Sequence, residues 1–247
     1  ARSSRYRIED IGYGGNHHHR YDRYSQVDGS EDRVKIIFLY GGGWQSGTRK
    51  DFRFVADTLC SLGFDVFVPD YRLYPEVRFG EILSDVVTAV DSIMDDNDGA
   101  FFVMGHSAGA QMGALLSLNT DLLRCPDRIV GFIGLAGPYD FYPYTEEAHW
   151  DLFAPKDTYP ASQPVNFVRE DAPPMLLLHG REDTRVRRGH SKSLMEKQQA
   201  TGGTASREVY DNMGHVGIIL SFTRMQRRKS KVLADLHQFV MQHKPKL

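Results

Sequence analysis

The chain has 247 residues and a mass of 28.0 kDa, with 41% hydrophobic and 25% charged residues, a composition typical of a soluble globular protein. It has 30 Lys and Arg residues and 32 Asp and Glu residues, so its net charge is close to zero. This balance removes the electrostatic argument for binding nucleic acid or an anionic membrane. From the length we expect one α/β domain over residues 1–247.

The N-terminus reads Ala-Arg-Ser-Ser-Arg, which lacks the apolar core of a secretory signal. No later apolar run approaches the ~18–20 residues that span a bilayer, so no membrane span is expected. Because the first residue is Ala1 rather than Met, removal of an upstream segment stays an open alternative. The compartment therefore stays open: a cytoplasmic location is slightly favoured, and a secreted or periplasmic one is the alternative if a signal was removed before Ala1.

Apolar runs alternate with helical patterns along most of the chain. After two polar segments at 6–11 and 20–24 that suit an antiparallel edge, the sequence predicts strands at residues 34–40, 64–68, 101–104, 129–135, 175–178 and 207–210. Helices are expected at residues 50–62, 81–94, 191–200 and 231–242. Another is expected to begin after the glycine turn at 105–109 and to end at residue 118. This alternation indicates an α/β fold, with a largely parallel sheet covered by helices on both faces.

The stretch from Pro138 to Pro174 breaks the alternation. A connection of this length inside a compact domain is usually functional or a lid, so we expect an irregular, cap-like insertion at about 138–174. Its aromatic residues would suit an apolar substrate, and a structural cap packed on the core is an equal alternative; they are Tyr139, Phe141, Tyr142, Tyr144, Trp150, Phe153, Tyr159 and Phe167.

Residues 105–109 carry the main chemical signal, because they read Gly-His-Ser-Ala-Gly between an expected strand and an expected helix. A serine on such a sharp turn takes strained backbone angles, and the positions two before and two after it must be small so that strand and helix can approach. The turn presents the hydroxyl at the carboxyl end of the sheet, beside a helix N-terminus that favours developing negative charge. Ser107 is the expected nucleophile, with a structural glycine turn as the alternative.

A serine nucleophile needs an adjacent imidazole as general base and a carboxylate that orients it. Of the 10 histidines, His215 lies in a glycine-flanked loop just after the last expected strand, where it can reach over the serine. The other nine suit this role less well. His17, His18 and His19 form a polar N-terminal cluster, and His106 is next to the serine but is expected to point elsewhere. His149 lies in the irregular stretch, His179 and His190 lie beside a turn, and His237 and His243 lie at the last helix.

Two adjacent carboxylates follow the strand at 175–178, and either could orient the imidazole. Asp183 is preferred because it precedes Thr-x-Val at the start of the next helix, whereas Glu182 is expected to be exposed. The alternative for Asp183 is a helix cap.

The segment at 40–44 reads Tyr-Gly-Gly-Gly-Trp and follows a buried strand. Glycines let backbone N–H groups approach a substrate oxygen closely, so Gly42 and Gly43, with the N–H of Ala108, form the expected oxyanion hole. A phosphate loop from Gly42 is excluded, because Thr48 stands where such a loop needs lysine.

The two cysteines, Cys60 and Cys125, have no metal-ligand spacing. Two buried thiols are the first expectation, and a single bridge between them is the alternative. No metal and no cofactor are expected.

Taken together, these motifs resemble the carboxylesterases of the hormone-sensitive-lipase-like branch of the α/β-hydrolase superfamily. The resemblance covers about residues 34–220 and rests on the glycine run before Trp44, residues 70–76 (Asp-Tyr-Arg-Leu-Tyr-Pro-Glu), the turn at 105–109, residues 180–186, and Gly214-His215. It implies an α/β-hydrolase fold with a mostly parallel eight-stranded sheet, ester hydrolysis without a cofactor, and a triad of Ser107, Asp183 and His215 in the chain order of that superfamily.

Two positions depart from that branch. Tyr40 stands where the branch usually has histidine, which leaves the backbone donors intact but alters how the glycine loop is held, and Tyr74 stands where alanine is common. The glycine and serine motifs are also similar to those of small aryl-acylamidases such as kynurenine formamidase, which keeps an amide substrate open.

The sequence therefore predicts a serine hydrolase that cleaves short-chain or aryl carboxylic esters through an acyl-enzyme, with Trp44 and Val216 near the substrate. An aryl-acylamidase or formamidase is the first alternative, and a non-catalytic binding protein of the same fold is the second. The expected partner is a small ester molecule, and the oligomeric state is left open. The basic residues between 224 and 231 are expected to be a solvated approach to the last helix.

Overall fold

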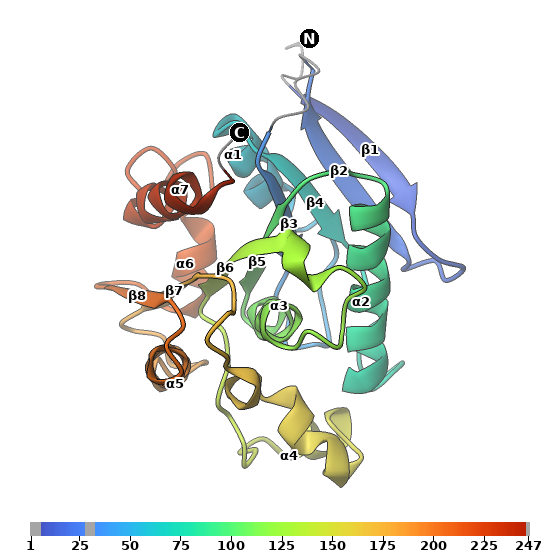
Figure 1. The fold of residues 1–247 in the computed structure, drawn as a ribbon, viewed down its shortest axis with the longest axis vertical. Helices are drawn as coiled ribbons and strands as arrows, with labels where there is room; N and C mark the ends of the chain where they lie inside the picture. Colours follow the sequence, from blue (N-terminus) through green and yellow to red (C-terminus); the bar gives the residue numbers. More distant parts are fainter. Residues whose placement is uncertain (1–5, 28–32, 246–247) are drawn as a thin grey trace.

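The computed structural model describes residues 6–27 and 33–245. Over these residues, strands form one sheet in the order β1-β2-β4-β3-β5-β6-β7-β8 (Figure 1). Their bounds are β1 Tyr6–Gly12, β2 Arg20–Gln26, β3 Lys35–Leu39, β4 Asp65–Pro69, β5 Phe101–His106, β6 Ile129–Leu135, β7 Met175–Gly180 and β8 Ala205–Tyr210. The pairs β1–β2 and β2–β4 are antiparallel and the remaining pairs are parallel, which confirms the expected mostly parallel, eight-stranded sheet.

The central strands consist of β-branched, leucine and aromatic residues that are buried on both faces of the sheet. In β3 the run Ile-Ile-Phe-Leu is fully buried, and every residue of β5 and β7 is buried. Such continuous apolar runs are what a parallel sheet needs when helices cover both of its faces. The carboxyl ends of β3, β5 and β7 consequently meet at one edge of the sheet, where the chain can gather side chains from distant segments.

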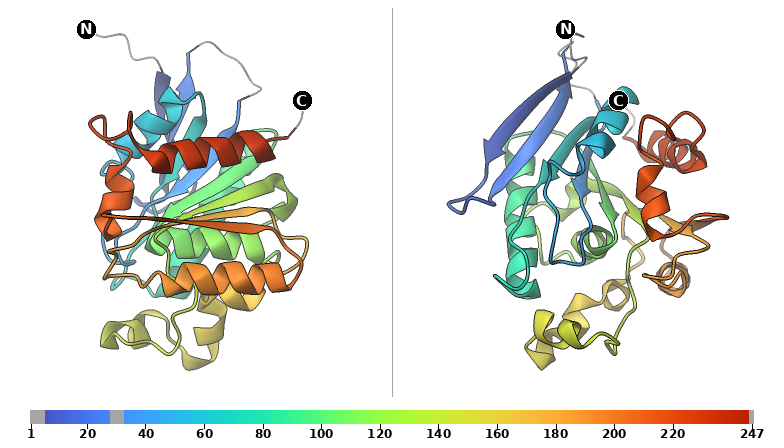
Figure 2. Two further views of the ribbon diagram at one scale, coloured as in Figure 1. Left: turned by 90° about the vertical axis from the view of Figure 1, so that its left-hand side faces the viewer. Right: turned by 180° about the vertical axis from the view of Figure 1, so that it is seen from behind.

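Helices cover the sheet on both sides, as expected (Figure 2). On one face lie α1 (Arg53–Ser61) and α7 (Lys231–His243), and on the other lie α2 (Phe79–Asp95), α3 (Ala108–Leu118) and α5 (Gly189–Ala200). The helix α3 is buried along its whole length between the sheet and the neighbouring segments, which explains its alanine- and leucine-rich sequence. No helix in the described ranges is both long and apolar enough to cross a membrane.

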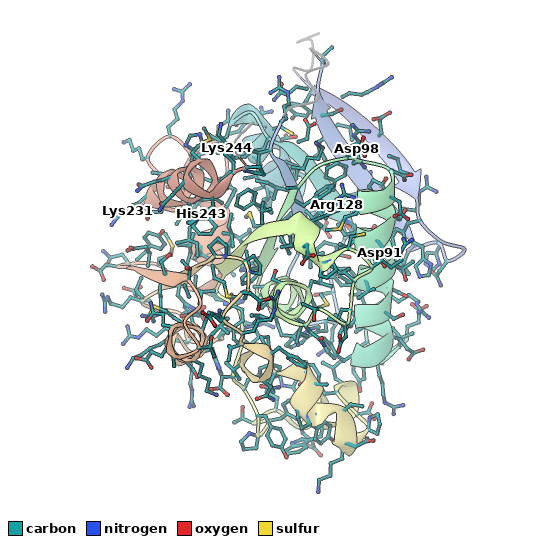
Figure 3. All side chains as sticks on the ribbon, in the orientation of Figure 1. Asp91, Asp98, Arg128, Lys231, His243 and Lys244 are labelled. Carbon is teal, nitrogen blue, oxygen red and sulfur yellow. The ribbon has the colours of Figure 1, made fainter. Side chains whose placement is uncertain are left out.

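Arg128, the last residue of the 3-10 turn η1 (Pro126–Arg128), fastens the carboxyl end of α2 to the start of β6 (Figure 3). Its guanidinium donates hydrogen bonds to the carbonyl oxygens of Met94 at 2.5 Å and Gly99 at 2.8 Å, and also to that of Asn97. The last carbonyls of a helix have no partner within the helix, so a basic side chain satisfies them well. This contact stabilises the amino ends of β5 and β6, opposite the edge where the candidate site lies.

The hairpin of β1 and β2 extends the sheet at one end, with Tyr6 opposite Gln26 and Gly12 opposite Arg20. β1 and β8 are the two outer strands in the strand order. Both present exposed side chains, which include charged residues: Arg7 and Asp10 on β1, and Glu208 on β8.

The irregular stretch at 138–174, called the cap segment below, connects β6 to β7 and contains α4 (Glu147–Leu152) and the 3-10 helices η2 (Lys156–Ser162) and η3 (Pro164–Phe167). Its aromatic rings pack on one another and on the protein body. The ring of Phe153 contacts Tyr144 at 5.0 Å and Phe79 at 4.7 Å, centroid to centroid. Phe153 is buried whereas Tyr142 and Trp150 are partly exposed, so the segment is a packed cap with an aromatic outer surface.

Most of the predicted helices and strands lie where expected, with ends displaced by a few residues. One prediction was wrong: His215 does not lie in a loop but is the first residue of a short helix, α6 (His215–Leu220). A second was partly wrong, because Cys60 is a buried free thiol but Cys125 is exposed, at a turn before β6.

Candidate active site

Ser107 stands on the turn between β5 and α3, at the carboxyl edge of the sheet. Its backbone angles, φ 53° and ψ −120°, are strained for a residue with a side chain. A Cβ added to Gly105 would lie 2.3 Å from the backbone of Gly109, and one added to Gly109 would lie 2.1 Å from the carbonyl oxygen of Leu39. These contacts are the physical reason for both glycines of the motif, since any larger residue would push the helix away from the strands.

A chain of hydrogen bonds joins Ser107, His215 and Asp183, three residues far apart in the sequence. Nε2 of His215 lies 2.9 Å from Oγ of Ser107, and Nδ1 lies 2.8 Å from Oδ2 of Asp183. Because an ionised carboxylate can only accept, Nδ1 carries the proton and Nε2 is left to accept the serine hydroxyl. This is the geometry required for a hydroxyl to lose its proton to an imidazole.

Asp183 is almost completely buried and is held on both of its oxygens. Oδ1 accepts hydrogen bonds from the backbone N–H groups of Arg185 and Val186, both at 2.9 Å, and Oδ2 lies 3.2 Å from Nε2 of His179. Burial alone would raise the pKa of Asp183, but the hydrogen bonds from His179, His215 and the Val186 N–H hold it well below its usual range. The carboxyl group therefore stays ionised, and Glu182 beside it is exposed as expected.

His179 and His106 are two residues near this chain whose role the sequence interpretation missed. Nε2 of the buried His179 also lies 2.9 Å from the carbonyl oxygen of Val186, so it must donate to both of its acceptors. His106 was expected to point elsewhere, but its ring packs against that of His215 with centroids 5.1 Å apart. Burial, followed by the nearby His215, lowers the pKa of His106 to about 3, so His106 is uncharged at neutral pH.

The glycine loop lies directly against the serine. A Cβ added to Gly41 would be 2.9 Å from Cβ of Ser107. Gly42 and Gly43 have φ values of +151° and +61°, and a Cβ on Gly42 would lie 1.8 Å from the carbonyl oxygen of Ser46. Ala108 begins α3, and its N–H precedes those of Ala110 and Gln111, which both bond to the Ser107 carbonyl. Backbone donors of the loop and of α3 thus flank the serine.

Tyr40 and Asp70 anchor the glycine loop through hydrogen bonds at its two ends. The hydroxyl of Tyr40 donates to Asp70 at 3.1 Å, and the same carboxylate accepts the backbone N–H of Arg49 at 2.5 Å. The ring of Tyr40 stacks on Tyr71, whose hydroxyl donates to the Tyr40 carbonyl at 2.8 Å. Tyr40 therefore holds the loop through its hydroxyl, its ring and its carbonyl.

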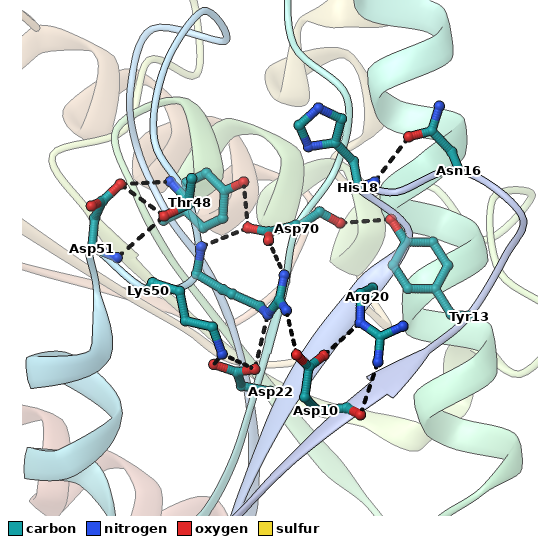
Figure 4. Close-up of polar contacts among 12 residues, drawn as sticks. Asp10, Tyr13, Asn16, His18, Arg20, Asp22, Thr48, Lys50, Asp51 and Asp70 are labelled. Atoms are coloured by element: carbon teal, nitrogen blue, oxygen red, sulfur yellow. Dashed lines mark hydrogen bonds and ion pairs between the residues drawn. The ribbon is translucent and has the colours of Figure 1, made fainter.

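The guanidinium of Arg49 extends this anchor to Asp10 and Asp22 of the N-terminal hairpin, which Figure 4 labels together with Asp70. It forms ion pairs with Asp70, with Asp22 at 2.8 Å and with Asp10 at 2.9 Å, and Lys50 binds Asp22 at 2.7 Å. Arg49, Asp22 and Asp70 are buried, so each charge depends on its partners.

A cavity of about 120 Å³ opens above Ser107, between the glycine loop, the cap segment and the chain after Asp183. The lining includes Trp44, which was expected near the substrate, and Gly43 of the glycine loop; the full set is Gly43, Trp44, Gln45, Ser107, Pro138, Phe141, Thr145, Glu146, His149, Arg185, Val186 and His190. Val216 was also expected there, but its side chain is 57% exposed and outside the lining, because α6 turns it to the surface.

In the part of the chain that the structure describes, no group of three or more His, Cys, Asp and Glu side chains is arranged to hold a metal ion. The polar groups around Ser107 instead form the hydrogen-bonded chain and the backbone donors described above.

Comparison with known proteins gives a match to the family model described as BD-FAE over residues 22–198, more than half of the chain. One relative is isoprenylcysteine alpha-carbonyl methylesterase ICME of Arabidopsis thaliana, 23% identical over 85% of this chain and 56% of the relative. Another is kynurenine formamidase of Danio rerio, 29% identical over 58% of this chain and 50% of the relative. This chain thus spans about half the length of the curated relatives it matches.

Among solved structures, the apo form of Thermogutta terrifontis esterase 2 superimposes with a TM-score of 0.79 at 20% identity, covering 97% of both chains. At this identity the likeness shows the fold. The resemblance expected from the sequence, an α/β-hydrolase fold with similarity to kynurenine formamidase, is confirmed.

Proposed function

The chain belongs to the BD-FAE family, and on that premise we propose that it is a serine hydrolase of the carboxylesterase type, which cleaves small esters through an acyl-enzyme. The observation that carries the proposal is the continuous hydrogen-bonded chain from Ser107 through His215 to Asp183. Named esterases among its relatives support the same class.

In the proposed acylation step, His215 takes the proton of Ser107 as Oγ attacks the ester carbonyl carbon. The Asp183 carboxylate holds the imidazole in the Nδ1–H tautomer and stabilises the cation that forms. His215 then gives its proton to the leaving alcohol oxygen, and the acyl group stays on Ser107. Water repeats the sequence, so the acid is released and the serine regains its proton.

The negative oxygen formed in both steps needs donors that are already in place. We assign this role to the backbone N–H groups of Gly42, Gly43 and Ala108. The support is that Gly43 lines the same cavity as Ser107 and that Ala108 begins the buried helix α3, whose N-terminus favours negative charge. Backbone donors that are fixed before the reaction need no reorganisation during it.

A small cavity with aromatic walls supports short-chain or aryl esters as the substrate class. In a series of p-nitrophenyl esters, we expect kcat/KM to be highest for short acyl chains and to fall as the chain lengthens. A rise beyond about eight carbons would contradict this substrate class and favour a lipase-like groove.

The central test is Ser107→Ala. We expect turnover of p-nitrophenyl acetate to fall by at least about 10³-fold, because the other groups act through the serine. Ser117→Ala in the same helix is the matched control; that hydroxyl only donates to the Gly113 carbonyl, so full activity is expected. A fluorophosphonate probe should label the wild type and the control but not Ser107→Ala. Unlabelled wild-type protein would favour the non-catalytic alternative.

An aryl-acylamidase or formamidase is the second candidate, and the similarity to kynurenine formamidase of Danio rerio is what favours it. The same groups could attack an amide, in which case His215 protonates a leaving amine. Phenyl acetate and N-formylaniline, compared at equal concentrations, separate the two: a larger kcat/KM for the formyl amide would select the amidase.

A further inference from the structure

Arg185 is a solvent-exposed cation that also lines the cavity above Ser107. It lines the cavity together with Ser107, and its Nη2 lies 3.8 Å from the point where a Cβ on Gly43 would stand. Its backbone N–H donates to Oδ1 of Asp183 at 2.9 Å. The turn that holds the proposed catalytic acid therefore also fixes the backbone of Arg185. From there the side chain extends to the glycine loop.

The guanidinium of Arg185 forms no ion pair and donates no hydrogen bond within residues 6–27 and 33–245. Other arginines of the chain do find acids: Arg72 binds both oxygens of Asp85, and Arg78 binds Asp151 at 2.6 Å. A planar guanidinium matches a carboxylate with two parallel hydrogen bonds and is weakly hydrated, so it suits recognition of an anionic ligand.

Two histidines and one acid, Glu146, line the same cavity as Arg185. Burial lowers the pKa of His149 and of His190, so both are uncharged at neutral pH. The Glu146 carboxylate, on the cap segment, is largely exposed and lies 3.5 Å from Nε2 of His149; among the described residues no ion pair joins it to Arg185. Arg185 is the one Lys or Arg among the residues that line the cavity.

We propose that Arg185 binds a carboxylate on the substrate, so that the preferred substrates are small esters or amides that carry a negative charge. This inference rests on the proposed hydrolase function and adds the charge of the substrate to it. The apolar walls of Trp44 and Phe141, whose rings stack at 6.0 Å, would hold the uncharged part of the molecule.

Matched pairs of substrates test the proposal, since the carboxylate could belong to the acyl part or to the leaving group. For the acyl part, p-nitrophenyl hydrogen glutarate is compared with neutral p-nitrophenyl valerate. For the leaving group, 3-acetoxybenzoate is compared with methyl 3-acetoxybenzoate. In at least one pair we expect Arg185→Gln to lower kcat/KM for the anionic member by about tenfold or more, and for the neutral member by less than about threefold.

Two controls sharpen the outcome. Arg187→Gln removes an exposed arginine two residues away that does not line the cavity, and it should leave both ratios unchanged. Added salt should weaken the wild-type preference for the anionic ester, because screening acts on the charge and not on the chemistry.

An equal loss for neutral and anionic esters would overturn the proposal, since it would mean that Arg185 acts on the reaction itself or on folding. Unchanged ratios in both pairs would overturn it as well. Failure of the proposed function is distinguishable, because the wild type would then not hydrolyse even the neutral esters.

Discussion

At the scale of single residues, the buried His106 beside Ser107 makes the stability of the fold depend on pH. The lowered pKa of His106, about 3 in the folded protein against about 6.5 when unperturbed, means that the unfolded chain binds its proton more readily than the folded one. The neutral ring thus stabilises the fold fully above pH ~6.5, and this contribution is lost as the pH falls from ~6.5 toward 3.

We expect His106→Gln to flatten the pH dependence of stability. Between pH 6.5 and about 3, the wild type should lose a few kcal/mol more of its free energy of unfolding than the variant does, because each unit of pKa difference is worth about 1.4 kcal/mol. Urea unfolding at a series of pH values measures this.

His17→Gln is the control for that experiment, because His17 is exposed and should leave the curve unchanged. Parallel curves for the wild type and His106→Gln would contradict the assignment.

The residues with a direct chemical signal in the sequence were the predictable ones. Ser107 could be identified from its flanking glycines, Gly105 and Gly109. A Cβ added to either glycine would lie within 2.5 Å of a backbone atom. His179 and His106 carry no such signal, because their roles come from contacts with Val186 and His215 that form only in the folded chain. Val216 failed for a related reason: proximity to His215 in sequence does not say which side of α6 a residue faces.

At the scale of the elements, the cap segment joins the cavity above Ser107 to the aromatic packing behind it. Phe153 contacts the ring of Trp44 at 5.1 Å, and Trp44 donates a hydrogen bond from Nε1 to Gln111 of α3 at 3.2 Å. The cap is therefore held to the glycine loop and to α3, the helix that follows Ser107.

We expect Phe153→Ala to loosen this connection. Removing a buried phenylalanine should lower the free energy of unfolding by about 3–5 kcal/mol and raise KM, because Trp44 and Phe141 lose a wall against which they pack. Thermal unfolding and ester kinetics measure the two effects.

The partly exposed Tyr142 provides the comparison for Phe153: Tyr142→Ala should reduce stability by only about 1 kcal/mol and leave KM unchanged. Equal losses from the two variants would show that the cap is not organised around Phe153.

Elements that bury a continuous apolar run or face were predictable from the sequence, and α6 and the helices inside the cap segment were not. The apolar run of β3 and the spacing of α7 determine their own structure, since each buries a continuous face. α6 spans only six residues, and Gly214 directly before it is typical of a turn. The helix forms because it packs against β7. The internal structure of the cap segment depends likewise on its aromatic contacts.

At the scale of the whole molecule, the ion pairs of Arg49 connect the N-terminal hairpin, the strand β4 and the glycine loop. Arg49 is the centre, since three carboxylates from three segments converge on one guanidinium. Charges buried in this way stabilise a fold only while all partners are present.

Arg49→Met should therefore lower the free energy of unfolding by about 3–5 kcal/mol, because Asp22 and Asp70 would be left buried with less compensation. It should also reduce kcat, since Asp70 anchors the loop of Gly42 and Gly43. Chemical denaturation and ester turnover measure the two results.

Arg20→Met is the control for the Arg49 ion pairs, because Arg20 pairs with Asp10 at a half-exposed position and should matter by less than about 1 kcal/mol. A similar small effect for Arg49→Met would show that the buried ion pairs do not stabilise the molecule.

The two outer strands bear on how copies of the chain behave when they are crowded together. A sheet edge with free backbone groups is a template on which the edge of another molecule can add. A strand of a second molecule that paired here would contact Arg7 and Asp10 along β1, or Glu208 along β8, and would have to desolvate those charges. The polar pattern of the edges thus protects the protein against edge-to-edge aggregation while the apolar strands between them stay covered.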